Sequence, residues 1–143
     1  MNDQTKTIDN ITPEDILNAL SDENIVRDTY NTLPVIIIEG DEYAVARGEQ
    51  EADEAVYAYV DDTLWAFCPS FLAEQTDLPV ELFEFLSNKD CDDNKIYRQL
   101  IESKTTVENF ADEAIAADGR GHFLASYDGE EIEIGNYLLY RIS

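Results

Sequence analysis

The sequence predicts an α+β domain in which a helical middle lies between two β-hairpins that form a small antiparallel sheet. Residues 33–47 and 130–142 are rich in β-branched or aromatic residues and contain a glycine turn signal, as hairpins do. Between them, apolar residues recur at intervals of three and four, the helical period. A chain of 143 residues can bury a core as one domain. We therefore expect a flexible tail over residues 1–10 and a single acidic domain over residues 11–143.

The first helix is expected to begin at "TPED". Thr12 is a suitable N-cap, Pro13 fits the first helical position, and Asp15 follows three residues after the cap. The segment "SDENIVRDTY", residues 21–30, is interpreted as a second helical piece. The apolar face of the first helix would consist of Ile16, Leu17 and Leu20.

The first hairpin is expected in "LPVIIIEGDEYAVAR". Residues 35–38 form one strand, the Gly40–Asp41 neighbourhood supplies the turn, and residues 43–47 form the second strand. The first strand is apolar on both faces, so we expect both sides of it to be covered.

The clearest helix prediction is "EQEADEAVYAYVDDTLWAF", residues 49–67. Trp65 lies beside its apolar stripe and is expected in the core. Tyr57 lies off the stripe among acidic residues, which allows an exposed interface anchor, and nothing in the sequence decides this. The stripe consists of Ala52, Ala55, Val56, Tyr59, Val60, Leu64 and Phe67.

Three short helices are expected next. One covers residues 68–76 and is opened by Pro69. Another covers residues 77–86, with Asp77 as its cap and Leu82, Phe83 and Leu86 turned inward. The third covers residues 90–104, with Asp90 as its cap.

The last helix is expected over residues 105–119. Thr105 and Glu108 have the spacing of a capping box, and Gly119 is a helix stop signal. The second hairpin follows, with its turn at Gly135–Asn136.

Net charge is the unusual property of this chain. It has 9 Lys and Arg against 32 Asp and Glu, a formal charge of −23. Residues 48–88 contain ten acidic residues and no Lys or Arg, and residues 105–119 add four acids without a cation. Such self-repulsion costs stability, and ordinary solvated faces mix both signs. The charge therefore favours a basic partner, with a halophilic composition as the alternative.

The spacing of the acids allows a more specific interpretation. Helical side chains three or four residues apart lie about 5–6 Å from each other, which approaches the spacing of phosphates along a nucleic-acid strand. Glu51, Glu54 and Asp61 have offsets of three and seven. The alternative is an ordinary solvated helix face. The predicted partner contacts are Glu49, Glu51, Asp53, Glu54, Tyr57, Asp61, Asp62, Glu108, Asp112 and Glu113.

The sequence lacks the residues that several kinds of metal-binding, catalytic and nucleotide-binding site require. The calcium-loop pattern fails at Lys95 and Ile101, where glycine and glutamate are needed. His122 is the one histidine, which argues against a zinc site and a histidine-based triad. The glycines of "DGRGHF" do not have the spacing of a nucleotide-binding loop. We expect no enzymatic activity, no metal and no cofactor.

The location is expected to be the cytoplasm of a bacterial host cell. The first ten residues are polar, unlike a signal peptide, and no apolar run is long enough to span a membrane. Cys68 and Cys91 are too few for a disulfide framework. An acidic surface repels both anionic lipid and nucleic acid, so neither a membrane nor direct nucleic-acid binding is expected.

Two segments carry a resemblance. "EADEAVYAYVDDTLWAFCPSFL" and "ENFADEAIAADGRGHFLASYDGEE" resemble segments of small acidic proteins carried by bacteriophages and other mobile elements. The resemblance implies a bacterial setting and no particular activity. By charge alone, the chain is also similar to the Ocr-type antirestriction proteins, which imitate DNA.

Together these observations lead to one functional hypothesis. The chain is expected to be a non-enzymatic phage or mobile-element inhibitor of a bacterial defence nucleoprotein, of the anti-CRISPR or antirestriction type. Its acidic, DNA-mimicking surface would occupy the basic groove that normally binds nucleic acid. The alternative is a phage or plasmid accessory protein-interaction module whose acidity is incidental. A metal-dependent hydrolase is the third interpretation.

Overall fold

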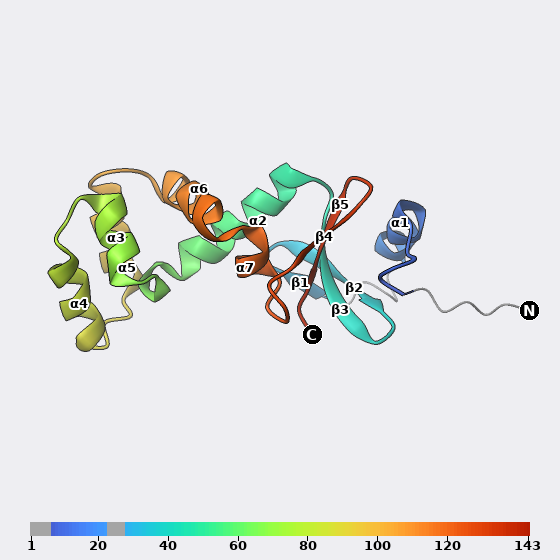
Figure 1. Ribbon diagram of the computed structural model, residues 1–143, viewed down its shortest axis with the longest axis horizontal. Helices are drawn as coiled ribbons and strands as arrows, with labels where there is room; N and C mark the ends of the chain where they lie inside the picture. The colour runs from blue at the N-terminus through green and yellow to red at the C-terminus, as the bar shows by residue number, and fades with distance from the viewer. Residues whose placement is uncertain (1–6, 23–27) are drawn as a thin grey trace, which may run out of the picture. The chain divides into compact units, whose positions relative to one another are not determined.

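The computed structural model describes residues 7–22 and 28–143 (Figure 1). It confirms the α+β class: the described part of the chain has seven α-helices, one 3₁₀ helix (η1) and five strands. In chain order these are α1 (Pro13–Ser21), β1 (Asp28–Tyr30), β2 (Leu33–Ile38), β3 (Asp41–Ala46), α2 (Glu49–Asp62), η1 (Leu64–Ala66), α3 (Pro69–Thr76), α4 (Val80–Asn88), α5 (Asn94–Glu102), α6 (Val107–Asp118), α7 (Arg120–Leu124), β4 (Glu131–Ile134) and β5 (Tyr137–Arg141).

The chain divides into two compact units where the sequence predicts one domain over residues 11–143. Residues up to Val56 together with Asp118–Ser143 form the sheet unit, and Tyr57–Ala117 form the helical unit. One boundary falls within α2 and the other at the end of α6. From the sequence, the sheet unit carries 19 acids and five cations, and the helical unit 13 acids and four cations.

Both predicted hairpins are present, and they join into one antiparallel sheet in the order β1-β2-β3-β5-β4. The first hairpin turns through Glu39 and Gly40, whose φ angles of 52° and 84° are those of a tight turn that favours glycine. The second turns at Gly135–Asn136, as predicted. The β3–β5 pairing, with Val45 opposite Leu139, unites the two hairpins across more than 90 residues of sequence.

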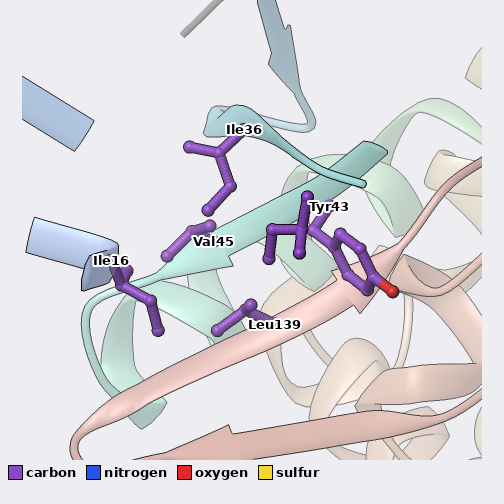
Figure 2. Packing of buried hydrophobic residues seen from close by; sticks show 6 residues of the cluster. Ile16, Ile36, Tyr43, Val45 and Leu139 are labelled. Carbon is purple, nitrogen blue, oxygen red and sulfur yellow. The ribbon is translucent and has the colours of Figure 1, made fainter. Parts of the chain in front are cut away.

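Each face of this sheet is covered, as the apolar first strand requires. On one face Ile36, Tyr43, Val45 and Leu139 pack with Ile16 of α1 (Figure 2). On the other face Val35, Ala44, Leu138 and Tyr140 are buried, and α7 contacts β5. The alternation follows from the two-residue period of a strand.

The N-terminal cap of α1 is confirmed. The Thr12 hydroxyl accepts a hydrogen bond from the Asp15 N–H, and the Asp15 carboxylate accepts one from the Thr12 N–H, so both halves of a capping box are present. Ile16 is buried, whereas Leu17 is 53% exposed instead of turned inward.

Two other N-terminal predictions fall only partly within the described residues. Residues 1–6 of the predicted tail lie outside them, and Thr7–Asn10 form a turn in which the Asn10 N–H donates to the Thr7 carbonyl. The helical piece predicted over residues 21–30 is wrong where it is described, because Asp28–Tyr30 pair with β2 as an edge strand. Residues 23–27 lie outside the described part.

The predicted helix over residues 49–67 ends earlier, at Asp62. Two side chains of α5 bind the free carbonyl of Asp61: Asn94 donates to it at 2.6 Å and Arg98 at 3.1 Å. These bonds satisfy an acceptor that a longer helix would have satisfied internally. The chain then turns into η1, so Trp65 is 45% exposed, and its predicted place in the core is wrong.

The predicted helices of the helical unit are present, but several caps differ. Asp77 ends α3 with a left-handed backbone instead of starting α4, which begins after Pro79. Asp93, not Asp90, caps α5 by accepting from the Lys95 N–H. In α6 the Thr106 hydroxyl, not that of Thr105, accepts from a helix-start N–H. For α5 and α6 the predicted and the observed cap are the same residue type, Asp or Thr, so the local sequence does not distinguish them.

Candidate partner-binding surface

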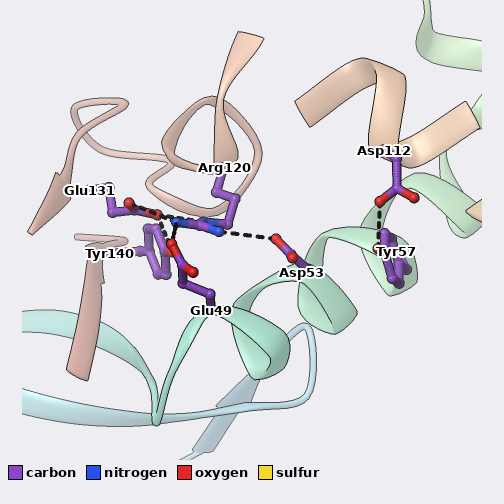
Figure 3. A network of polar contacts seen from close by, with 7 residues as sticks. All are labelled: Glu49, Asp53, Tyr57, Asp112, Arg120, Glu131 and Tyr140. Atoms are coloured by element: carbon purple, nitrogen blue, oxygen red, sulfur yellow. Dashed lines mark hydrogen bonds and ion pairs between the residues drawn. The ribbon is translucent and has the colours of Figure 1, made fainter. Parts of the chain in front are cut away.

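The strongest polar cluster of the sheet unit centres on Arg120. Its guanidinium donates two hydrogen bonds to Glu131, at 2.7 and 3.1 Å, and one to Asp53 at 3.1 Å (Figure 3). Glu49 lies farther away, at 3.5 Å, and the Tyr140 hydroxyl donates to Glu131 at 2.6 Å. One cation thus neutralises carboxylates from α2 and β4.

The local sequence explains how Arg120 reaches this position. Gly119 has φ 84°, a conformation that other residues adopt at a cost, and it ends α6 and starts α7. A Cβ at Gly121 would lie 2.4 Å from the Gly129 carbonyl oxygen, so only glycine lets α7 pack against that loop. The glycines of "DGRGHF" therefore serve to place Arg120 beside Glu131.

Titration properties follow from this geometry. The hydrogen bonds from Arg120 hold the pKa of the Glu131 carboxyl below its usual value. Those bonds to Glu131 also raise the pKa of Arg120, which stays charged. Burial, and then the hydrogen bond to Glu131, raises the pKa of the Tyr140 phenol, so it stays neutral.

The two other predicted contacts in the sheet unit, Glu51 and Glu54, each have a partner four residues earlier in the chain. Glu51 forms a 3.7 Å ion pair with Arg47 and accepts from the Arg47 N–H. Glu54 is exposed and accepts from the Gln50 amide at 3.4 Å. Of the four predicted contacts in this unit, Glu49 and Asp53 come together around Arg120.

In the helical unit, Asp61 and Asp112 take part in structural contacts. Asp61 accepts a charge-assisted hydrogen bond from Arg98 of α5. The Tyr57 hydroxyl donates to Asp112 at 2.5 Å, joining α2 to α6 (Figure 3). Tyr57 is half-buried, and its role as an interface anchor stays a prediction.

The remaining predicted contacts are exposed acids. Asp62 ends α2, and Glu108 and Glu113 lie on α6. The predicted row of Glu51, Glu54 and Asp61 is therefore partly neutralised, because Arg47 and Arg98 pair with two of its three members. The acids with the greatest freedom to meet a partner lie elsewhere on α2 and α6.

Most of the described Lys and Arg side chains are paired with groups of the protein itself. Among the seven Lys and Arg in residues 7–22 and 28–143, five form ion pairs with carboxylates. A sixth, Lys89, lies 5.8 Å from the centre of the Phe85 ring. The surplus of carboxylates is left facing solvent.

Acids also occupy helix ends where they are unfavourable. Asp62 closes α2 and Asp118 closes α6, and neither helix has a basic residue in its last turn. A negative charge at a helix C-terminus opposes the helix dipole and costs about 0.3–1 kcal/mol. Helix stabilisation therefore does not account for these residues.

Sequence reasoning missed Arg120, Glu131 and Tyr140. The signal that could have found them is an arginine held between two glycines in an acid-rich segment. His122 is exposed on α7, with its ring against that of Phe123. Within the described ranges, no group of three or more His, Cys, Asp and Glu is arranged to hold a metal ion, and no helix there is long and apolar enough to cross a membrane.

Comparison with known proteins gives no further constraint. No protein-family model, curated protein or solved structure matches the chain.

Proposed function

We propose that this protein is a non-enzymatic inhibitor that binds the basic, nucleic-acid-binding groove of a bacterial defence protein and excludes nucleic acid from it. The setting, a phage or mobile element acting in the cytoplasm of its bacterial host, comes from the sequence resemblance. The mode of action comes from the charge.

One observation carries the proposal: five of the seven described Lys and Arg residues form ion pairs within the protein, while acids remain exposed, some of them at helix ends where they cost stability. A fold that accepts this cost retains charge for a purpose outside itself. Carboxylates on rigid helices present fixed negative charges, as a phosphate backbone does.

The alternative is an accessory module that binds through apolar contacts. Trp65, Phe85 and Ile96 are exposed in the helical unit, at 45%, 58% and 38%. Salt separates the two modes. An acidic surface that replaces a phosphate backbone loses affinity steeply as salt rises, whereas an apolar interface persists in molar salt.

The test uses two matched charge reversals. Glu108→Lys with Glu113→Lys changes exposed acids of α6, and Glu130→Lys with Glu133→Lys changes exposed acids of the second hairpin. Both pairs alter net charge by the same amount, and none of the four residues forms an ion pair in the described structure. The partner is first captured from a nuclease-treated bacterial lysate on the immobilised acidic protein and is then released with double-stranded DNA. The affinity of each variant for this released partner is measured by biolayer interferometry.

We expect the α6 pair to weaken binding at least tenfold and the hairpin pair to weaken it less than threefold. Circular dichroism verifies that each variant is folded. Equal binding by the α6 variant and the parent would contradict the assignment of this surface. Capture that DNA does not release would contradict the inhibitory mode itself.

A further inference from the structure

A groove in the helical unit has an exposed tryptophan as part of its wall. The groove has a volume of about 490 Å³ and lies among η1, the start of α3, the end of α4 and the loop before α5. Its lining includes Trp65, Cys68, Asp90, Asp92 and Tyr97. The volume is in the range of sites that hold a side chain or a small ligand.

The chain on either side of Trp65 is held in place by contacts of Leu64 and Phe67. The Leu64 N–H donates to the Asn94 side chain at 2.8 Å, which fixes η1. The Phe67 ring packs edge-on against Phe110 at 4.9 Å and stacks on Phe71 at 5.6 Å. The backbone that carries Trp65 is therefore ordered by these contacts, so less of it has to be fixed when a ligand binds.

The chemistry of the groove suits a cation. Asp90 and Asp92 are exposed, and no Lys or Arg is among the described residues that line the groove. Tyr97 is 2% exposed, and its hydroxyl donates to the Cys91 carbonyl at 3.0 Å. An exposed indole and two carboxylates are complementary to a guanidinium group, which stacks on aromatic rings and donates to carboxylates at the same time.

We propose that this groove receives an arginine side chain from a basic segment of the partner protein, with its guanidinium stacked on Trp65 and hydrogen-bonded to Asp90 or Asp92. The inference rests on the proposed function, since it supposes a basic protein partner. It adds the specific residue type that is recognised and the place where it docks. Lysine fits less well, because an ammonium group does not stack as a plane.

Two native reporters make the groove measurable without substitution. Trp65 is the one tryptophan of the chain, so emission excited selectively from tryptophan, and not from the eight tyrosines, reports on this site alone. Cys68 is exposed and lines the same groove, and its hydrogen bond with Ser70 lowers the pKa of its thiol. Hexa-arginine, hexa-lysine and hexa-glutamine peptides serve as probes.

Hexa-arginine is expected to change Trp65 emission saturably and to slow iodoacetamide alkylation of Cys68. Hexa-lysine should bind at least about threefold more weakly, and hexa-glutamine should have no effect. Unchanged emission and an unchanged alkylation rate with hexa-arginine would overturn the inference.

Matched variants locate the binding. Asp90→Asn with Asp92→Asn, and separately Trp65→Leu, should weaken hexa-arginine binding about fivefold to tenfold by calorimetry. Glu130→Gln with Glu133→Gln makes the same change in charge outside the groove, at exposed acids of the second hairpin, and should weaken it less than threefold. Equal losses in the two acidic pairs would mean diffuse attraction and would remove the groove proposal, whereas the partner-capture result would be unaffected.

Discussion

Replacing Arg120 tests how the fold tolerates its acidity. Arg120→Met keeps the length of the side chain and removes the guanidinium, whose side chain is only 16% exposed. It abolishes the paired hydrogen bonds to Glu131 and the bond to Asp53, and it leaves two carboxylates without their cation.

The magnitude follows from burial. Stranding one partner of a fully buried pair costs about 3–5 kcal/mol. The side chains of Glu131 and Asp53 are 30% and 33% exposed, so water recovers part of this loss. We expect Arg120→Met to lower the free energy of unfolding by about 2–3 kcal/mol and the melting temperature by roughly 5–10 °C.

The assay is urea unfolding followed by far-ultraviolet circular dichroism at pH 7. Arg120→Lys is the matched control: it retains the charge but not the paired geometry, and it should lose less than Arg120→Met. Because Arg120 lowers the pKa of Glu131, the stabilisation is fully present above the ordinary glutamate pKa and is lost as pH falls through the lowered value. A loss below about 0.5 kcal/mol for Arg120→Met would refute the assigned role, since that is the range of ordinary surface substitutions.

Three further predictions concern charge and titration. Asp118→Lys should stabilise the protein by up to about 1 kcal/mol, and Glu108→Lys should destabilise it by a similar amount, because the two residues lie at opposite ends of the α6 dipole. Both changes are measured by urea unfolding. A shift of the two unfolding free energies in the same direction would contradict the helix-dipole argument. Raising ionic strength from about 0.01 to 0.5 M should increase the melting temperature and weaken partner binding, because salt screens both the internal repulsion and the attraction to the partner. A melting temperature that falls with salt would count against this explanation. Burial raises the pKa of Tyr43, Tyr97 and Tyr140, so their stabilising contribution is present below about pH 10 and is lost as pH rises through their raised values. Absorbance at 295 nm should then show fewer than eight tyrosines ionised in the folded protein near pH 11, and full ionisation there without unfolding would disprove it.

Local signals predicted most of the fold. The capping residues of α1 and the two hairpin turns are determined within a few residues, and the helical periods of the middle segment are visible in sequence. The end of α2 was not predictable in this way, because Asn94 and Arg98, more than 30 residues away, bind the Asp61 carbonyl. Trp65 was misplaced for the same reason, since its exposure depends on where α2 stops.

The sequence shows that the candidate surface is rich in acidic residues, but it does not show which of these residues pair with cations in the fold. Nothing local distinguishes Asp53, which meets Arg120, from Glu54 beside it, which remains exposed. Whether an acid is paired or exposed depends on which acids lie near the few cations after folding. Glu131 was overlooked because a carboxylate on a short strand has no helical period to mark it.

The most direct measurement of the central claim is a competition isotherm on the captured partner. Fluorescence anisotropy would record the binding of a labelled nucleic-acid duplex to that partner at increasing concentrations of the acidic protein. Pure competition is the predicted result: the apparent dissociation constant rises linearly with inhibitor concentration, and excess duplex restores full binding. A ternary complex of duplex, partner and acidic protein would show that the carboxylates do not take the place of a phosphate backbone.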